Sequence, residues 1–281
     1  MKDPILTRVV RALERVPGLA AIVLGGSRAR GTAGPASDYD IGLYYEPAAP
    51  LDIAALQSAI APLVDDPSPT VTPVGEWGPW INGGGWLAVG GFKVDLLYRD
   101  LARVREIIAD ARQGRISMNY QPGHPHGFCS AIWMGEVAIC QPLLDPFGII
   151  ARLKRECWPF PNALKDALVT RFGWEVDFAI ENARIAARRL EQTHVAGCAY
   201  RALCCMAQVL FAMNGRYLIN EKGAVTEAAT CPITIEGLAD VQGQVWRDIG
   251  NANYDCALHR LTSLSNRLRA ISVHHPVGNQ A

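Results

Sequence analysis

The spacing of apolar residues divides the chain into two regions. Up to about Ala111, short apolar runs alternate with segments of helical spacing. From about Phe128 onward, almost every segment has the three- and four-residue spacing of helices. The stretch between them is rich in proline and glycine, which is typical of a linker. We therefore predict a first domain over 1–113, a linker over 114–127 and a helical domain over 128–281.

The first region has the pattern of a mixed layer of strands and helices. Leu19–Leu24 is apolar on both faces, as in a buried strand. Gly90-Gly91 separates two β-type runs and favours a tight hairpin, because adjacent glycines adopt the positive φ of such turns. Asp100 is placed to cap the helix that follows it. In chain order we predict a helix over 5–16, strands at Leu19–Leu24 and Asp38–Tyr45, a helix over Leu51–Val64, hairpin strands at Trp86–Val89 and Phe92–Tyr98, and a helix over Leu101–Arg112.

The second region contains long helical patterns with few breaking residues. The clearest are Asp166–Glu191, Val195–Met213 and Tyr254–Ile271. Together with the first region they predict an α+β fold, in which an N-terminal mixed β-sheet with flanking helices is followed by a C-terminal helical bundle.

Composition narrows the classes of function. The 281 residues include 27 Lys+Arg and 27 Asp+Glu, so the formal net charge is zero. A protein that coats nucleic acid would need an excess of bases to neutralise phosphates, so we expect no nucleic-acid partner. Apolar residues make up 49% of the chain and charged residues 19%, which is typical of a folded protein and not of a disordered one.

The eight cysteines indicate neither disulfides nor zinc. None of them forms a Cys-x-x-Cys pair, and Cys204 and Cys205 fall in an apolar helical stretch as small core residues. The N-terminal stretch has charges spread through it and is not a signal peptide. No run approaches the roughly 18 to 20 uncharged apolar residues of a membrane span. We therefore expect a soluble, cytoplasmic protein with reduced thiols and no membrane partner.

The most informative segment begins where the first predicted strand ends. Gly25-Gly26-Ser27 allows a sharp turn that exposes backbone N–H groups, and a helix beginning there would offer them to an anion. The Ser27 hydroxyl can donate to a phosphate oxygen, and Arg28 and Arg30 add positive charge nearby. The pattern therefore predicts a phosphate-binding turn.

Acidic residues follow on the next predicted strands. Asp38 and Asp40 are two residues apart, so a strand directs both carboxylates to one face. Adjacent carboxylates repel unless a cation lies between them, and Mg²⁺ prefers such oxygen ligands. Asp95 is a third acid, in the middle of a later strand. It is either a further metal ligand or a structural acid paired with Lys93 or Arg99.

This combination resembles a known superfamily. Gly-Gly-Ser-x-Ala-Arg-Gly, then Ser-Asp-x-Asp, then a strand aspartate is similar to the nucleotidyltransferases related to DNA polymerase β. A compact catalytic domain followed by a helical bundle resembles the aminoglycoside and lincosamide nucleotidyltransferases within that group. The resemblance covers residues 19–98 and is looser in the C-terminal half.

The resemblance implies site residues and ligands. Asp38, Asp40 and Asp95 would bind one or two Mg²⁺ ions, and an NTP, with ATP the expected one, would be the co-substrate. The phosphates would be held by Gly26, Ser27 and Arg30. A lysine of the helical domain reaches the triphosphate in relatives of the aminoglycoside type, and Lys222 in Asn220–Gly223 is our candidate for it.

These features predict a nucleotidyltransferase that moves a nucleoside monophosphate onto a hydroxyl of a small molecule, such as an aminoglycoside-like compound, and releases pyrophosphate. Antibiotic modification would be its biological setting. Glu76 is either a general base for the acceptor hydroxyl or an ordinary loop acid. Alternative functions are transfer to a protein or tRNA partner, or nucleotide binding without catalysis. No self-complementary patch indicates an oligomeric state.

Two further groups of residues have open interpretations. Trp77, Trp80, Trp86 and Asn82 lie close together in the sequence, and they either stack on a base or sugar-like ring or pack between the domains. The spacing of His124 and His126 suits a metal. Because no cysteine or third ligand is near them, we predict solvated loop histidines.

Overall fold

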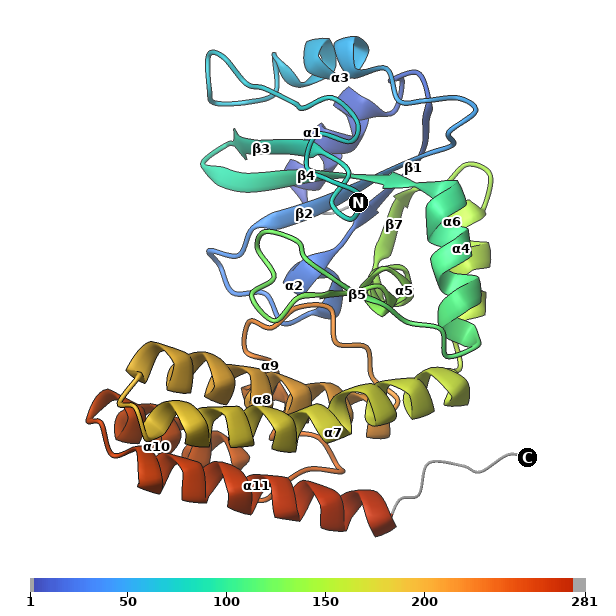
Figure 1. Ribbon diagram of the computed structural model, residues 1–281. Helices are drawn as coiled ribbons and strands as arrows, with labels where there is room; N and C mark the ends of the chain where they lie inside the picture. Colours follow the sequence, from blue (N-terminus) through green and yellow to red (C-terminus); the bar gives the residue numbers. More distant parts are fainter. Residues whose placement is uncertain (1–2, 275–281) are drawn as a thin grey trace. The chain divides into compact units, whose positions relative to one another are not determined.

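The computed structural model describes residues 3–274, which pack into two compact units (Figure 1). The first unit holds the chain up to Ala109 together with Trp133–Pro159. The second unit holds Asp110–Ile132 and the chain from Phe160 onward. These boundaries differ from the predicted ones, because Trp133–Pro159 returns to the first unit. The predicted linker over 114–127 is part of the second unit.

A five-stranded mixed sheet forms the centre of the first unit (Figure 1). Its strands lie in the order β3-β4-β2-β1-β7. β2 and β4 are parallel, and the other neighbouring pairs are antiparallel. The strands are β1 (Leu19–Leu24), β2 (Tyr39–Tyr45), β3 (Gly84–Val89), β4 (Phe92–Asp100) and β7 (Gln141–Leu144).

The helices wholly or mainly in this unit flank the sheet. They are α1 (Pro4–Leu13), α2 (Gly26–Arg30), α3 (Ile53–Ile60), α4 (Leu101–Arg112), α5 (Ala131–Ile139) and α6 (Ile149–Cys157). Asp3 caps α1 and Asp100 begins α4, each by accepting hydrogen bonds from backbone N–H groups of the first turn. The predicted α+β fold, with a mixed sheet, flanking helices and a C-terminal helical region, is confirmed.

The two faces of the sheet have different environments. Alternate residues of β2 and β4, including Ile41, Leu43, Val94 and Leu96, are buried in one core with apolar residues of α1 and α3. The residues between them, which point to the opposite face, are half-buried at Asp40, Gly42, Asp95 and Leu97. One end of this second face is therefore partly accessible to solvent, and we call it the open face.

The hairpin predicted at Gly90-Gly91 is present. Both glycines have positive φ, 58° and 79°, which a two-residue turn requires and other residues rarely adopt. Their N–H groups donate to the two oxygens of Asp65, at 3.0 and 2.8 Å. These hydrogen bonds, chiefly the one from Gly91, lower the pKa of Asp65.

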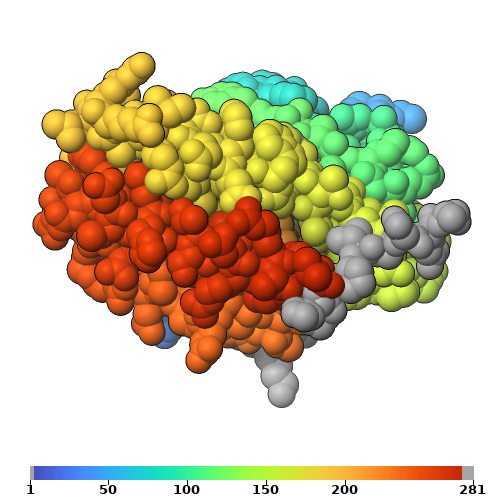
Figure 2. Space-filling model, turned by 60° about the horizontal axis from the view of Figure 1, so that its bottom comes forward, coloured from blue at the N-terminus to red at the C-terminus, as the bar shows by residue number. Residues whose placement is uncertain are grey.

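The second unit consists mainly of long helices. Its elements are β5 (Met118–Asn119), β6 (Phe128–Cys129), α7 (Asn162–Ala187), α8 (Gln192–Met213), α9 (Ala224–Ala228), α10 (Leu238–Gly250) and α11 (Tyr254–His274). α7 packs on both α8 and α11, and Figure 2 shows α7 and α11 side by side at the surface. Within the described residues, α8 alone has the length and apolarity of a membrane span, but most of it is buried inside the unit.

All eight cysteines are free thiols in the structure. Cys204 and Cys205 are buried in α8, where burial raises the pKa of their thiols to about 11 and about 12. Thiols with raised pKa are poor nucleophiles at neutral pH, so these cysteines are core residues.

Candidate active site

The predicted phosphate-binding turn follows β1 directly. β1 ends at Leu24, and the short helix α2 begins at Gly26, with Gly25 as its extended N-cap. The N–H of Gly25 donates to the carbonyl of Asp40 at 2.7 Å. The turn is therefore fastened to the start of β2. Ser27 and Arg30 are half-buried residues of α2.

Gly26 and Asp40 are in close contact. Gly26 has φ of +60°, and a Cβ added there would lie 1.8 Å from Oδ2 of Asp40. No side chain fits in that space, because real Cβ contacts do not come below about 3 Å. The glycine thus lets the Asp40 carboxylate lie directly against the backbone of the turn.

Asp40 and Asp95 stand side by side in the sheet. They are register partners in the parallel strands β2 and β4, whose separation is about 4.8 Å. Both are half-buried and on the open face. Asp38 is half-buried too, and it lies in the loop immediately before β2. The structure therefore brings Gly26, Asp40 and Asp95 together, with Asp38 two residues away along the chain.

Arg28 fixes the backbone beside Asp38. Its Nε donates to the carbonyls of Ser37 and Asp38, at 3.2 Å each, and Nη2 donates to Ser37 at 2.7 Å. The guanidinium also lies over the Tyr39 ring, 3.7 Å from its centroid. The sequence suggested only positive charge at Arg28. Its observed role is to tie α2 to the loop that carries Asp38.

The donor set suits a hard cation, although the three aspartates do not form a closed cluster. Among residues 3–274, no group of three or more His, Cys, Asp or Glu side chains has the arrangement of a metal site. Asp40 and Asp95 are nevertheless adjacent carboxylates on one open face, and such oxygens are the ligands that Mg²⁺ prefers. The chemistry of these donors therefore fits Mg²⁺.

Glu76 and Lys222 belong to other segments, Glu76 to a loop of the first unit and Lys222 to the second unit. Glu76 is exposed in a turn before β3 and makes no side-chain hydrogen bond or ion pair within the described residues. Lys222 belongs to the second unit, where it is exposed and its N–H donates to Oδ1 of Asn220 at 2.8 Å. The roles of both residues stay predictions.

The predicted aromatic group separates into two parts. Trp80 is buried and packs on Trp133 of the first unit, with ring centroids 5.6 Å apart and the Trp133 Nε1–H donating to the Trp80 carbonyl. Asn82 donates to the hydroxyl of Tyr45. Trp77 and Trp86 instead stack on each other, and Trp86 is exposed. Trp80 is thus a core residue, whereas Trp86 is available to a ligand.

A buried ion pair, not anticipated from the sequence, lies at the buried end of the sheet face that carries Asp40 and Asp95. Arg99 is 2% exposed and donates from Nε and Nη2 to the two oxygens of Glu136 in α5, both at 2.9 Å. Burial acts to lower the pKa of Arg99, but the Glu136 carboxylate outweighs it and the pKa is raised. Arg99 therefore pairs with Glu136, and not, as one interpretation of the sequence had it, mainly with Asp95.

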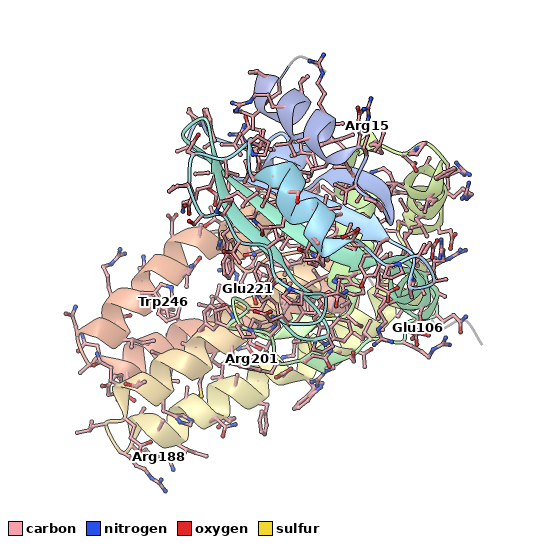
Figure 3. The ribbon with its side chains drawn as sticks, turned by 90° about the horizontal axis from the view of Figure 1, so that it is seen from above. Arg15, Glu106, Arg188, Arg201, Glu221 and Trp246 are labelled. Carbon is pink, nitrogen blue, oxygen red and sulfur yellow. The ribbon has the colours of Figure 1, made fainter. Side chains whose placement is uncertain are left out.

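The prediction of solvated histidines was wrong. His126 is 4% exposed, its backbone N–H donates to Oε1 of Glu221 at 3.2 Å, and its ring Nδ1 lies 3.1 Å from Nη1 of Arg201. Arg201 and Glu221, both marked in Figure 3, come from α8 and from the loop before α9. His124 Nδ1 is 3.2 Å from Glu221 Oε2, without the angle of a well-formed hydrogen bond. Sequence spacing could not reveal this network, because its members are far apart in the chain.

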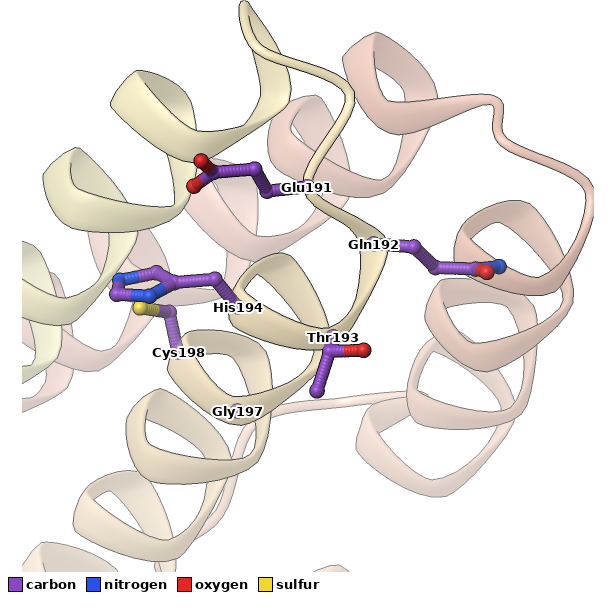
Figure 4. Close-up of a pocket in the computed structure, with 6 residues that line it drawn as sticks. All are labelled: Glu191, Gln192, Thr193, His194, Gly197 and Cys198. Carbon is purple, nitrogen blue, oxygen red and sulfur yellow. The ribbon is translucent and has the colours of Figure 1, made fainter.

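The second unit also has an open hollow of about 680 Å³ at the start of α8 (Figure 4). Its lining consists of Glu191, Gln192, Thr193, His194, Gly197 and Cys198. Most of the surface area of this lining comes from apolar atoms, and no predicted site residue contributes to it.

Comparison with known proteins finds a family-model match that lies mostly in the first unit. Residues 6–114 match the family model of the nucleotidyltransferase domain. Among solved structures, a nucleotidyltransferase-like protein from Exiguobacterium sibiricum is 12% identical, with a TM-score of 0.41 over 96% of this chain and 77% of that chain. No curated protein matches the chain. The matched range contains the glycine turn and all three aspartates, and this match to a nucleotidyltransferase domain supports nucleotidyl transfer as the general activity.

Proposed function

We propose that this protein is a Mg²⁺-dependent nucleotidyltransferase. It transfers a nucleoside monophosphate from an NTP, with ATP as the expected donor, to a hydroxyl group of a small molecule and releases pyrophosphate. The observation that carries the proposal is the pairing of Asp40 with Asp95 on the open face of the sheet, beside the Gly26 turn. A phosphate-binding turn next to two carboxylates is the arrangement that positions a metal-bound triphosphate for in-line transfer.

The turn and the aspartates have separate tasks. The N–H groups of the turn, the Ser27 hydroxyl and the Arg30 guanidinium bind phosphate oxygens and orient the leaving pyrophosphate. Asp40 and Asp95, with Asp38, would hold the Mg²⁺, which neutralises charge on the triphosphate when it is bound. Lys222 remains a predicted additional phosphate ligand.

Transfer requires one bond to form and one to break. The acceptor oxygen attacks the α-phosphorus, the bond from the α-phosphorus to the bridging oxygen breaks, and pyrophosphate leaves with that electron pair. The proton of the acceptor hydroxyl passes to a carboxylate. We assign this task to Asp95, which lies beside Asp40, with Glu76 as the alternative base.

For the acceptor, we propose a small hydroxylated compound such as an aminoglycoside. The balance of 27 basic and 27 acidic residues supports such an acceptor over a nucleic acid, which would favour a basic surface. A protein acceptor is the second candidate, a tRNA ranks below it, and nucleotide binding without catalysis is the remaining alternative.

The decisive experiment combines binding and turnover. Binding of Mg²⁺ and the analogue α,β-methylene-ATP is measured by calorimetry, and pyrophosphate release from ATP is screened with aminoglycosides, small alcohols and candidate proteins. We expect Asp38→Ala with Asp40→Ala to abolish both signals while the far-ultraviolet circular dichroism is unchanged. Asp66→Ala, an exposed loop carboxylate, is the matched control. Undiminished release by the folded double variant would refute the proposal. Analogue binding without release from any acceptor would favour the non-catalytic alternative.

A further inference from the structure

The parts of the site follow one another across the sheet in a definite order. The glycine turn follows β1, Asp40 is on β2, Asp95 is on β4, and Trp86 is on the edge strand β3. Trp86 is the register partner of Asp95, just as Asp95 is the partner of Asp40. Directly opposed residues of neighbouring strands share a face, so Trp86 stands on the same open face as the two carboxylates.

Trp86 presents an unusual surface for a position next to charged groups. Its side chain is 72% exposed, whereas Trp80 in the preceding loop is 6% exposed. Trp77 stacks against it with ring centroids 4.4 Å apart and an interplanar angle of 19°. A stacked neighbour restricts the orientation of the indole, so that a flat apolar surface is held at the edge of the carboxylate site.

In-line transfer decides which substrate this surface faces. The attacking oxygen and the leaving pyrophosphate lie on opposite sides of the α-phosphorus. If the glycine turn on the β1 side binds the pyrophosphate and the aspartates hold the centre, the attacking group enters from the β3 side, where Trp86 stands. We propose that Trp86, backed by Trp77, is the platform on which a ring of the acceptor stacks. This inference rests on the proposed function.

The surroundings indicate the kind of ring. The negative face of an indole attracts C–H groups that carry partial positive charge, such as those on one face of a pyranose or cyclitol. Asp95 lies opposite Trp86, and Glu76 precedes Trp77 in the chain, while Lys93 is the cation two residues before Asp95. Carboxylates therefore outnumber the cation among these three charged residues. The acceptor ring is polyhydroxylated and neutral or cationic.

The test uses D-glucosamine as the probe. Its binding is measured by saturation-transfer NMR in the presence of Mg²⁺ and α,β-methylene-ATP. Glucose 6-phosphate is the anionic counterpart, and glycerol supplies hydroxyls without a ring. We expect saturation transfer to the ring C–H protons of glucosamine, less to glucose 6-phosphate and none to glycerol. Trp86→Ala should weaken glucosamine binding roughly five- to tenfold, and Trp86→Phe should retain most of it.

Two controls separate this inference from other causes. Trp174→Ala removes a comparably exposed tryptophan, 54% exposed, from α7 of the second unit and should leave glucosamine binding unchanged. Affinity for the ATP analogue should be the same in Trp86→Ala and the unmodified protein. Because Trp86 is exposed, its replacement should not disturb folding.

The possible outcomes distinguish the two proposals. Equal glucosamine binding by Trp86→Ala and the unmodified protein, or no saturation transfer to any ring probe, would overturn the platform. Loss of analogue affinity in Trp86→Ala would overturn it too, because the indole would then hold the nucleotide base. Absence of analogue binding in the unmodified protein would instead count against the proposed function, while the glucosamine signal would still report on Trp86.

Discussion

Asp40 and Asp95 are register partners in the two parallel strands of the sheet, with the carboxylate of Asp40 packed against the backbone of Gly26. The parallel pairing of β2 with β4 places these residues directly opposite each other, although 54 other residues separate them in the chain. A shift of one residue in this pairing would direct one of them to the apolar core instead. The register of a single strand pair therefore determines whether the site exists.

The first prediction concerns ligand-linked stability. If Asp95 helps to hold Mg²⁺, then Mg²⁺ with α,β-methylene-ATP should raise the free energy of unfolding of the unmodified protein and not that of Asp95→Asn. A ligand at 100 times its Kd stabilises a protein by about 2.7 kcal/mol. Urea denaturation with and without these ligands measures the effect, with Asp66→Asn as the control. Equal stabilisation of Asp95→Asn would indicate that Asp95 has only a structural role.

Gly26 and Gly31 allow the close contact at the turn to be tested separately from backbone strain. Both have positive φ, +60° and +73°, but only a Cβ at Gly26 meets the Asp40 carboxylate, since nothing lies within 4 Å at Gly31. Each alanine substitution should lower the free energy of unfolding by about 1 kcal/mol, because alanine is strained at positive φ. Gly26→Ala should in addition displace Asp40 and abolish calorimetric binding of the Mg²⁺–ATP analogue, which Gly31→Ala should retain. Normal binding by Gly26→Ala would contradict this account of the turn.

Local patterns in the sequence predicted much of the first unit. β1 and α4 have the predicted bounds, Leu19–Leu24 and Leu101–Arg112, because an apolar run and a capped helix each carry their own signal. β7 was missed and fell in a stretch predicted to be helical. It has only four residues, includes Pro142 and lies at the sheet edge, where a missing N–H is tolerated.

The candidate site was predictable in its residue types but not in its contacts. The spacing of Asp38 and Asp40 predicted two carboxylates on one face, which stays a prediction because Asp38 lies in the loop before β2. The pairing of Asp95 with Asp40 depends on tertiary structure. The Arg99–Glu136 pair joins residues 37 positions apart, and neither side chain stands in a pattern that identifies the other. Long-range pairs of this kind leave no periodic trace in the sequence.

Arg28 should affect the site through the backbone that carries Asp38. It donates to the carbonyls of Ser37 and Asp38 from one planar guanidinium, a geometry that lysine does not reproduce. Arg28→Ala should therefore lower the free energy of unfolding by about 1–3 kcal/mol and weaken Mg²⁺–ATP analogue binding. Arg28→Lys should recover only part of both losses. Full recovery by lysine would show that stability and analogue binding depend on the positive charge and not on the hydrogen bonds of the guanidinium.

The free energy of unfolding should fall more when one partner of the Arg99–Glu136 pair is removed than when both are replaced. Glu136→Ala leaves the buried Arg99 guanidinium without its carboxylate and should lower the free energy of unfolding by about 3–5 kcal/mol. Replacing both residues by methionine removes the buried charge and should cost less. Denaturant titration of the three proteins measures this difference. A double variant less stable than Glu136→Ala would show that the pair contributes net stability.

His126 should make the stability of the second unit depend on pH. Burial, assisted by the charge of Arg201, lowers the pKa of His126 to about 4, compared with 6.5 for an ordinary histidine. Between these values the unfolded chain binds a proton that the folded chain does not, so the free energy of unfolding falls as pH decreases from 6.5 towards 4. The loss amounts to about 3 kcal/mol, at about 1.4 kcal/mol for each pH unit.

His126→Gln removes this titration and should flatten the dependence on pH. Burial raises the pKa of Glu221, but the neighbouring His124 ring, a backbone hydrogen bond and His126 together outweigh it and lower the pKa from 4.5, so Glu221 adds a second loss at lower pH. Urea denaturation between pH 7 and pH 5.5 isolates the contribution of His126, since Glu221 is predominantly ionised there in both states. His194→Gln, at the start of α8, is the matched control and should keep the slope of the unmodified protein. If the free energy of unfolding of His126→Gln still falls with decreasing pH, another group binds the proton on unfolding.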